Sequence, residues 1–322
     1  MKAIVQHRYG SPDVLEMADV AQPAAGDDEL LIRVRATSVN LYDWHYLTGT
    51  PYVMRLQAGL RSPRQLIPGA DVAGEVEAVG RNVTRFQPGD KVFGLSSGAF
   101  AEYLTARADR MVRIPAGLTF EQAAAVPMAA LTALQGLRDR GRLRPGQKVL
   151  VNGASGGVGT FAVQLAAALG AEVTAVCSTG NVGAARSLGA DHVIDYTCES
   201  FTDTGRRYDL ILDIAGNRSI ADRKRALTPR GTLVLVGGPK HNQWFGPIGS
   251  LLALLVVGRF SRRRLVGMLT RNSADDLAVV AELMTAGLVT PAIERTYALH
   301  ELPEALAYLG EGHAQGKIVV TG

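Results

Sequence analysis

The chain has few cysteines and few aromatic residues, and it has no long apolar run. Two cysteines, Cys177 and Cys198, occur in 322 residues, which excludes a disulfide framework and indicates a reducing compartment, where we expect the cytoplasm. The uninterrupted apolar run at 251–257 is far shorter than the ~20 residues that cross a bilayer. Residues 1–6 have the pattern of a strand and not of a signal peptide.

A strong excess of one charge is also missing. The formal net charge is +4 at pH 7, and the basic residues are scattered except for the arginine cluster at 262–264. No basic stripe with interleaved aromatic residues is present, so we expect no nucleic-acid partner. We interpret the apolar run at 244–259 as a helix over the active site or at a dimer contact. The alternative is membrane contact, with the arginines facing anionic lipid.

Glycine, by contrast, is abundant, and four glycines fall within residues 153–159. This loop follows an apolar strand at 148–152 and precedes an apolar helix at 158–169. A glycine loop in this position is typical of a dinucleotide site, because the helix N-terminus presents free N–H groups and a positive dipole end to the pyrophosphate. Gly159 would let the helix pack closely on the strand. The residues predicted to bind the pyrophosphate are Ser155, Gly156, Gly157 and Val158.

The end of the next strand, at 171–176, lacks the acidic residue that an NAD-selective fold places there. Cys177, Ser178 and Thr179 follow instead, so a 2′-phosphate would meet no carboxylate and would find two hydroxyl groups. We therefore predict NADPH as the cofactor. The residues expected to line or reach the adenosine phosphate are Ser178, Thr179, Tyr196, Arg186 and Lys317.

Two patterns of secondary structure divide this α/β chain. Residues 1–120 hold short strands separated by turns rich in Gly, Pro and Asp, which indicates a compact, partly open β-barrel. Residues 121–294 alternate helices with buried apolar strands, which is typical of a doubly wound parallel sheet. We expect one helix at 120–137 and a return of residues 295–322 to the first domain. The other predicted elements are strands at 4–6, 29–38, 71–79, 91–93, 192–195, 208–213, 231–236 and 317–320, and helices at 181–188 and 303–309.

Motifs spread over nearly the whole chain have the residues and spacing of one family. They are VNLYD at 39–43, PGADVAGE at 68–75, FQPGDKVFG at 86–94, AAVPMAALT at 124–132, the glycine loop, GADHVIDY at 189–196 and GKIVV at 316–320. Together they resemble the medium-chain dehydrogenase/reductase superfamily, and most closely its zinc-independent quinone oxidoreductase branch. The resemblance implies a GroES-like catalytic domain at 1–120 and 295–322, a Rossmann domain at 121–294, and a homodimer that pairs through the sheet edge near 231–236.

The chain departs from the zinc-dependent relatives at both of their metal sites. Those relatives bind catalytic zinc with a cysteine and a His-Glu pair, where this chain has Asn40, Ala70 and Asp71. Their structural zinc needs a lobe of four cysteines, and no cysteine precedes Cys177. We therefore expect no metal site. Acceptors that are already activated, such as quinones and α,β-unsaturated ketones, then suit the chain better than alcohols.

The resemblance implies hydride transfer from the nicotinamide C4 of NADPH to a small-molecule quinone or α,β-unsaturated carbonyl. Asn40 would hold the cofactor ribose or a substrate carbonyl, and Tyr46 or Tyr52 would donate a hydrogen bond to the reduced oxygen. Asp43 would either take part in catalysis or cap the helical turn at 44–47. The residues expected near the nicotinamide and its ribose are Thr132, Gly237 and Gly238.

Two other functions remain open from the sequence. One is an alcohol or aldehyde oxidoreductase with the same fold and an NAD(P) cofactor. The other is a non-catalytic NADPH-binding scaffold, associated with a membrane through residues 244–264.

Overall fold

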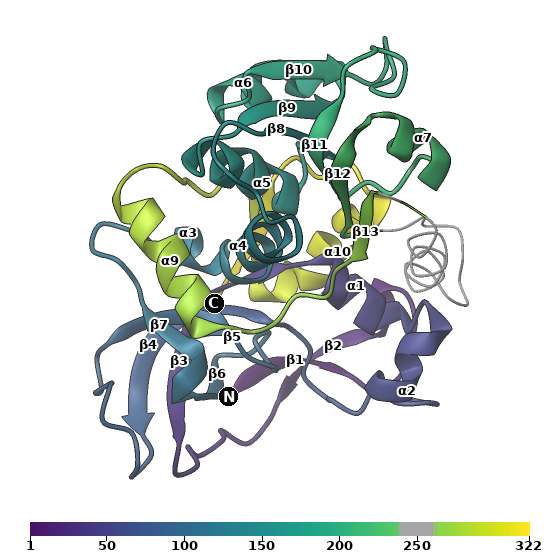
Figure 1. The fold of residues 1–322 in the computed structure, drawn as a ribbon. Helices are drawn as coiled ribbons and strands as arrows, with labels where there is room; N and C mark the ends of the chain where they lie inside the picture. Colours follow the sequence, from purple (N-terminus) through teal and green to yellow (C-terminus); the bar gives the residue numbers. More distant parts are fainter. Residues whose placement is uncertain (238–260, 262) are drawn as a thin grey trace. The chain divides into compact units, whose positions relative to one another are not determined.

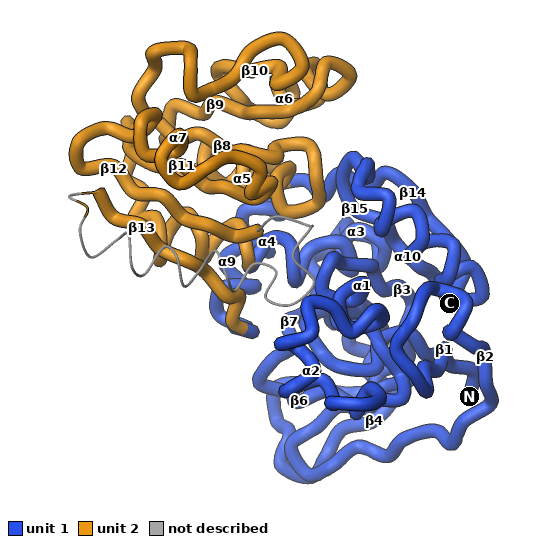
Figure 2. The backbone as a smooth tube through the Cα atoms, turned by 90° about the vertical axis from the view of Figure 1, so that its right-hand side faces the viewer, with its two compact units in different colours: residues 1–131, 272–286, 290–322 blue, residues 132–271, 287–289 orange. Residues whose placement is uncertain are grey.

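The structure is a computed structural model that describes residues 1–237, 261 and 263–322, and the chain forms two compact units. Unit 1 is blue and unit 2 is orange in Figure 2. Unit 1 comprises Met1–Leu131, Asn272–Ala286 and Thr290–Gly322, and unit 2 comprises Thr132–Arg271 and Gly287–Val289. Each unit is built on a sheet of its own.

The boundaries between the units differ from the domain boundaries predicted near 120 and 294. The chain passes from unit 1 to unit 2 after Leu131 and first returns to unit 1 at Asn272. Helix α3 (Phe120–Ala124) packs on strands β3 (Glu29–Val39) and β4 (Asp71–Val79), and helix α9 (Ala274–Thr285) packs on β7 (Met111–Arg113). These contacts group both helices with unit 1, whereas their alternation with strands had suggested the second domain.

The main sheet of unit 1 has seven strands. Their order is β14-β15-β3-β4-β5-β7, with β6 also paired to β3. The pair β14–β15 is parallel and the other pairs are antiparallel, and β15 aligns with β3 so that Ile318 faces Val39. The remaining strands are β1 (Lys2–Gln6) and β2 (Leu15–Asp19), which pair with each other, β5 (Lys91–Leu95), β6 (Tyr103–Arg107), β14 (Ile293–Ala298) and β15 (Lys317–Thr321). The other helices are α1 (Leu41–Thr48), α2 (Arg55–Ala58) and α10 (Leu302–Glu311).

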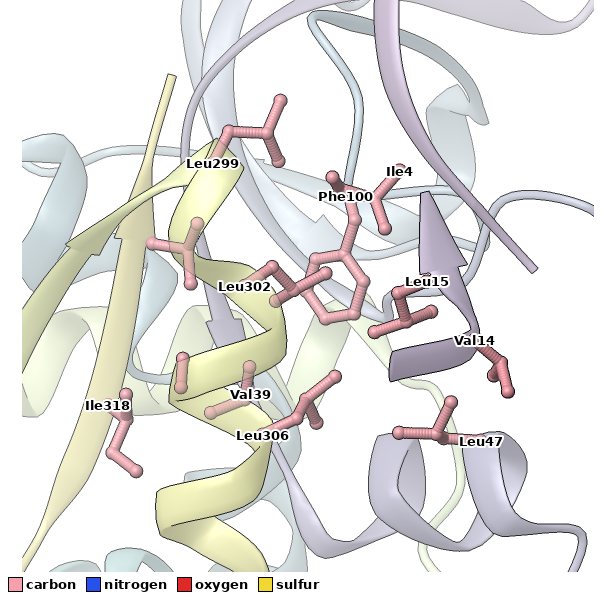
Figure 3. Packing of buried hydrophobic residues seen from close by; sticks show 12 residues of the cluster. Ile4, Val14, Leu15, Val39, Leu47, Phe100, Leu299, Leu302, Leu306 and Ile318 are labelled. Atoms are coloured by element: carbon pink, nitrogen blue, oxygen red, sulfur yellow. The ribbon is translucent and has the colours of Figure 1, made fainter. Parts of the chain in front are cut away.

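A hydrophobic cluster ties the last strand of unit 1 to its first helix. Figure 3 shows Val39 at the end of β3, Leu47 of α1, Leu306 of α10 and Ile318 of β15 among its members. Side chains alternate between the two faces of a strand, so Lys317 points to the face opposite Ile318. The cluster therefore holds the last turn of α1, the end of β3 and the strand that carries Lys317 together.

Unit 2 contains a parallel sheet in the order β10-β9-β8-β11-β12-β13, which can be followed in Figure 1. This order is that of the doubly wound α/β fold, so the predicted fold class is confirmed. Ligands of such sheets bind at the carboxyl ends of the strands where the order reverses, here between β8 and β11. The strands are β8 (Lys148–Asn152), β9 (Glu172–Cys177), β10 (His192–Asp195), β11 (Tyr208–Asp213), β12 (Leu227–Leu235) and β13 (Arg264–Gly267), and the helices are α5 (Gly157–Ala168), α6 (Val182–Ser187) and α7 (Ile220–Arg225).

The single helix predicted at 120–137 is wrong. Helix α3 ends at Ala124, α4 (Pro127–Leu134) begins anew, and a π-helical segment follows at Gln135–Arg140. Pro127 has no N–H to donate to the preceding turn, and its fixed φ suits the first position of a helix. The proline therefore divides one apolar segment into two helices.

The sheet edge predicted near 231–236 is also not an edge. Strand β12 pairs with β11 on one side and with β13 on the other, where Thr232 lies opposite Arg264. Strand β13 has four residues, and such a short strand gives little periodic signal in a sequence. Within the described residues, the sheet therefore ends at β13 and not at β12.

Candidate functional site: a helix N-terminus in unit 2 and a buried polar cluster in unit 1

The glycine loop joins β8 to α5 at the carboxyl edge of the sheet in unit 2. Ser155 and Gly156 lie in the loop, and Gly157 and Val158 begin the helix. Gly156 is the N-cap of α5, its backbone is extended, and no side chain caps the helix. The first N–H groups of α5 therefore have no intrahelical acceptor. A Cβ atom on Gly156 would meet nothing within 4 Å, so the helix end and the space beside it fit a phosphate group.

A buried polar network holds the strand ends behind this loop. Asn152 donates from Nδ2 to Oδ1 of Asp213 over 2.7 Å, and the Gly216 N–H donates to the same oxygen over 3.0 Å. Oδ2 of Asp213 forms a 2.5 Å ion pair with Nε of Arg223, although these two atoms lack hydrogen-bond geometry. Arg223 does not stand out in the sequence, because nothing distinguishes it from its basic neighbours Lys224 and Arg225 in α7.

Three residues predicted for the adenosine phosphate come together at the carboxyl ends of β9 and β10. Ser178 directly follows β9, and Thr179 shares a 3.0 Å hydroxyl contact with Thr197. The Tyr196 N–H donates to the carbonyl of Cys177 over 3.0 Å, which joins the two strand ends. The N–H groups of Gly153 and Ala154 in the glycine loop donate to the carbonyl of Val176 in β9. The hydroxyl groups therefore gather beside this loop.

The structure adds a carboxylate that the sequence analysis did not foresee at this edge. Asp195 ends β10 opposite Cys177, and its Oδ1 accepts from the N–H and the Oγ1 of Thr197 over 2.9 and 2.7 Å. Hydrogen bonds from Thr179 and then Thr197 lower the pKa of Asp195, so its carboxyl group is ionised at neutral pH. This charge opposes a 2′-phosphate and therefore weighs against the predicted preference for NADPH.

Two residues predicted to reach the phosphate have other surroundings. Arg186 lies in the last turn of α6 and lines a pocket with Asp191 and His192, at the start of β10 and thus at the opposite edge from Ser178. Lys317 belongs to unit 1, where it is 3% exposed and where its ammonium group has acceptors. Both placements differ from the predicted role, because Arg186 lies at the opposite edge of the sheet and the ammonium group of Lys317 is buried among its own acceptors.

The residues predicted near the nicotinamide have packing roles within unit 2. The hydroxyl of Thr132 lies 2.6 Å from that of Thr270 and is buried. A Cβ atom on Gly237 would lie 2.1 Å from the carbonyl oxygen of Ile214, so close backbone packing requires glycine there. This is a different reason from the predicted approach of a ribose. Gly238 lies outside the described residues.

In unit 1, the ends of three strands bring a buried polar cluster together. Asn40 follows β3, Asp71 begins β4 and Lys317 begins β15. The ammonium of Lys317 donates to Oδ1 of Asn40 over 2.6 Å and pairs with Oδ2 of Asp71 at 3.3 Å. Nδ2 of Asn40 donates to the same carboxylate oxygen over 2.9 Å. Asn40 and Lys317, assigned by the sequence to different roles, therefore belong to one cluster.

Asp43 extends this cluster from the first turn of α1. Its Oδ2 accepts from the backbone N–H of Asn40 over 2.8 Å, which is the carboxylate half of a capping box. Its Oδ1 is buried without a hydrogen-bond partner. Burial, and next the negative charge of Asp71, raise the pKa of Asp43 to about 7. The capping role predicted for Asp43 is therefore present, and the same group titrates near neutrality.

The two candidate tyrosines differ in their surroundings. The hydroxyl of Tyr46 accepts from the Gln65 N–H over 2.8 Å, which leaves its proton available for donation. Tyr52 follows Pro51 and is partly exposed. The guanidinium of Arg55 lies 4.8 Å from the ring centroid of Tyr52 and 4.4 Å from that of Tyr9. Cation–π contacts therefore hold Tyr52, a role for Arg55 that the sequence analysis had missed.

The described part of the chain holds neither a metal-binding cluster nor a membrane-spanning helix. Across residues 1–237, 261 and 263–322, no group of three or more His, Cys, Asp and Glu side chains is arranged to hold a metal ion. No helix in these same stretches has the length and apolarity that a membrane crossing needs. The segment proposed for membrane contact, 244–264, lies largely outside the described residues. Arg263 and Arg264 are described, and they donate to the backbone carbonyls of Thr228 and Arg140 over 3.2 and 2.5 Å.

Comparisons with known proteins agree with this architecture. Residues 26–116 match the alcohol dehydrogenase GroES-like domain, and residues 188–320 match the zinc-binding dehydrogenase family. The chain is 33% identical to the chloroplastic quinone-oxidoreductase QR1 of Triphysaria versicolor over 99% of its length and 98% of the relative's. It is 32% identical to the 2-methylene-furan-3-one reductase of Solanum lycopersicum, over 99% of this chain and 79% of that one.

A solved structure shows the same likeness in three dimensions. The quinone oxidoreductase from Coxiella burnetii superposes with a TM-score of 0.88 at 30% identity, covering 100% of this chain and 99% of the other. The chain therefore belongs to the medium-chain dehydrogenase/reductase superfamily. Within it, the chain falls in the quinone oxidoreductase-like branch, which makes it an oxidoreductase that binds NAD(P) and acts on a small molecule.

Proposed function

We propose that this protein is a zinc-independent, NADPH-dependent reductase that transfers a hydride to a quinone or an α,β-unsaturated carbonyl. The uncapped start of α5, open beside Gly156, is the observation that carries the proposal. NADPH supplies the hydride when it is bound. The residues of the chain bind its pyrophosphate at 155–158 and its adenosine end at Ser178, Thr179 and Tyr196.

The preference for NADPH rests on the groups after β9. Ser178 and Thr179 offer hydroxyl groups where a carboxylate would select NADH. Asp195 is the opposing charge, and the hydrogen bonds from Thr197 engage only its Oδ1. We expect the hydroxyl groups to decide the preference, because they lie directly after the strand that borders the glycine loop.

The choice of acceptor rests on the polar groups of unit 1. Asn40, Ala70 and Asp71 stand where zinc-dependent relatives have metal ligands, so an acceptor that is already conjugated suits this chain. Tyr46 has a hydroxyl proton to donate to the developing oxyanion. The names of the quinone oxidoreductase and furanone reductase relatives support this class of acceptor.

The decisive experiment follows NADPH oxidation by the purified, metal-stripped protein. The acceptors are 1,4-benzoquinone, 9,10-phenanthrenequinone and a simple enone, with NADH run in parallel. We expect turnover without metal and a higher kcat/KM with NADPH. Restoration of activity by added zinc would overturn the zinc-independent assignment, and equal rates with NADH would overturn the cofactor preference.

Two alternatives have outcomes of their own in the same experiment. Turnover of simple alkanols or aldehydes without added metal would favour an alcohol or aldehyde oxidoreductase. NADPH binding without turnover of any acceptor, together with flotation on anionic liposomes, would favour a membrane-associated scaffold.

We also propose that the chain forms a homodimer in the cytoplasm. The dimer is the arrangement implied by the family resemblance, and the cytoplasm follows from the low number of cysteines, both of which are free. Light scattering after size exclusion measures the mass in solution. A single species of 34.2 kDa would contradict the dimer.

A further inference from the structure

The side-chain amide of Asn40 is held at both ends. Its Oδ1 accepts from Nζ of Lys317 over 2.6 Å, and its Nδ2 donates to Oδ2 of Asp71 over 2.9 Å. Asn40 is 8% exposed, and the other two side chains are buried still more deeply. An amide with both ends engaged cannot flip, so the ion pair sets the orientation of Asn40.

The ammonium group of Lys317 has little capacity left for a ligand. Besides Asn40 and Asp71, at 2.6 and 3.3 Å, Nζ contacts the carbonyl oxygen of Val39 at 3.4 Å. Three acceptors match the three N–H donors of an ammonium group. Lys317 therefore acts on its neighbours and not directly on a substrate.

The carboxylate of Asp71 is equally well satisfied. Its Oδ1 accepts from the Met128 N–H over 2.8 Å, and its Oδ2 accepts from Ser38 over 2.5 Å as well as from Asn40 and Lys317. The side chain is fully buried. Three neutral donors and one cation therefore balance this buried charge.

Asp43 is the exception in the cluster. It is 1% exposed, and its Oδ1 has no partner while Oδ2 accepts from the Asn40 N–H. The titratable groups that act on Asp43 from the packed elements are Asp71 of β4 and Lys317 of β15. Asp71 raises the pKa of Asp43, and Lys317 lowers it. Burial, and next the charge of Asp43, raise the pKa of Tyr42 on the same helix.

We propose that Lys317 and Asp71 are positioning residues, whose buried ion pair fixes the amide of Asn40 and sets the protonation state of Asp43. Asn40 and Asp71 stand at positions where zinc-dependent relatives have metal ligands, and Lys317 places an ammonium group beside both of them. The unpartnered Oδ1 makes Asp43 the member of the cluster that can carry an exchangeable proton. The ion pair itself takes no part in bond making.

The catalytic consequence rests on the proposed function. Hydride transfer delivers two electrons and one proton to the acceptor and leaves it as an oxyanion. The carboxyl O–H bond of Asp43 breaks as an O–H bond forms on that oxygen, and the resulting carboxylate takes a proton from water before the next cycle. Because Oδ1 is buried, both proton transfers require this oxygen to become exposed during the cycle. This step needs no co-reactant besides NADPH and water.

A carboxyl titration followed by ¹³C NMR tests the proposal on the resting protein. The signal of Asp43 is assigned by its loss in Asp43→Asn, and its midpoint is compared in Lys317→Met, Asp71→Asn and the double variant. We expect Lys317→Met to raise the midpoint and Asp71→Asn to lower it, each by about one pH unit. The double variant should return close to the wild-type midpoint.

Thermal unfolding separates this role from a merely structural one. A midpoint that stays constant in folded Asp71→Asn would overturn the proposal, even if Tm falls. If Lys317→Met does not fold, two other variants take its place. The double variant removes both charges and leaves no unpaired buried carboxylate, and Lys317→Arg keeps the positive charge beside Asp71. Lys148→Met is the matched control, since Lys148 forms an ion pair with Glu172 in unit 2 and should leave the Asp43 midpoint unchanged.

Kinetics then test the link to the reaction. We expect the double variant Lys317→Met/Asp71→Asn to have a kcat at least tenfold lower than that of the wild type, with little change in KM. The variant Lys317→Arg, which keeps the cation, should lose less of its kcat. In variants that shift the midpoint, the pH profile of kcat should move by the same amount. An unmoved profile would overturn the role of Asp43 in proton transfer. If the wild-type protein reduces no quinone or enone, the proposed function fails, while the NMR result still decides the positioning role.

Discussion

A Cβ atom on Gly159 would lie 2.1 Å from the carbonyl oxygen of Gly153, while the same atom on Gly156 would meet nothing within 4 Å. Two glycines three residues apart in one loop therefore serve different purposes. Gly159 is required by the packing of α5 on the loop, and Gly156 leaves room for a ligand.

This contrast predicts that a substitution at Gly159 destabilises the fold, whereas a substitution at Gly156 removes cofactor binding. Gly159→Ala should lower the free energy of unfolding by about 3 kcal/mol, because the backbone must move to relieve the contact. Gly156→Val should keep the wild-type Tm and lose NADPH binding, since the new side chain occupies the space for the pyrophosphate. Thermal unfolding and NADPH fluorescence measure both. Gly183→Ala, at another open position, is the control, and unchanged affinity in Gly156→Val would refute the phosphate assignment.

The buried pair Asp213–Arg223 predicts a large loss of stability when one partner is removed. Arg223→Met leaves the Asp213 charge buried with two neutral donors, which should cost about 3–5 kcal/mol in urea unfolding. The double variant with Asp213→Asn should recover much of this loss. Arg225→Met is the control in the same helix, because the Arg225 side chain is 62% exposed and solvent screens its ion pair with Asp222. A loss no larger than that of the control would contradict a stabilising pair.

The end of β9 predicts the cofactor preference. Ser178→Asp should weaken NADPH binding more than NADH binding, because the new carboxylate would meet the 2′-phosphate. Fluorescence titration with each cofactor gives the two affinities. Ser187→Asp adds the same charge on the exposed end of α6 and should change neither. Equal weakening of both cofactors by Ser178→Asp would argue against this position of the phosphate.

The raised pKa of Asp43 predicts how stability depends on pH. In the folded chain the pKa is about 7 instead of 3.8, so between these values the folded state binds a proton that the unfolded state lacks. Stability from this group is present below pH 3.8 and is lost as pH rises through 7. Relative to Asp43→Asn, the free energy of unfolding of the wild type should fall by about 3 kcal/mol between pH 5 and pH 8. Parallel curves for the two proteins would disprove the shift.

The sequence predicted those features that depend on neighbours along the chain. The glycine loop between β8 and α5 is a local signal, and so is the alternation of strands and helices that gives the parallel sheet. The break at Pro127 was also local, but the apolar residues on both sides concealed it. Strand β13 was too short to produce a pattern of its own.

The polar clusters could not be predicted in the same way, because their members are far apart in the sequence. Asp71 and Lys317 are separated by 246 residues, and Asn152 and Asp213 by 61. Nothing local shows that Lys317 is buried, since an isolated lysine usually lies at the surface. The role of Lys317 becomes visible only when β15 pairs with β3.

The pairing of β15 with β3 determines when unit 1 can complete its folding during synthesis. Strand β15 is synthesised long after β3 and β4, so Asp71 and Asn40 leave the ribosome before the cation that balances them. Until β15 is added, the nascent chain would have to bury the Asp71 carboxylate without Lys317 or keep this part of unit 1 open to water. We therefore expect unit 1 to complete its folding only after translation of its last strand.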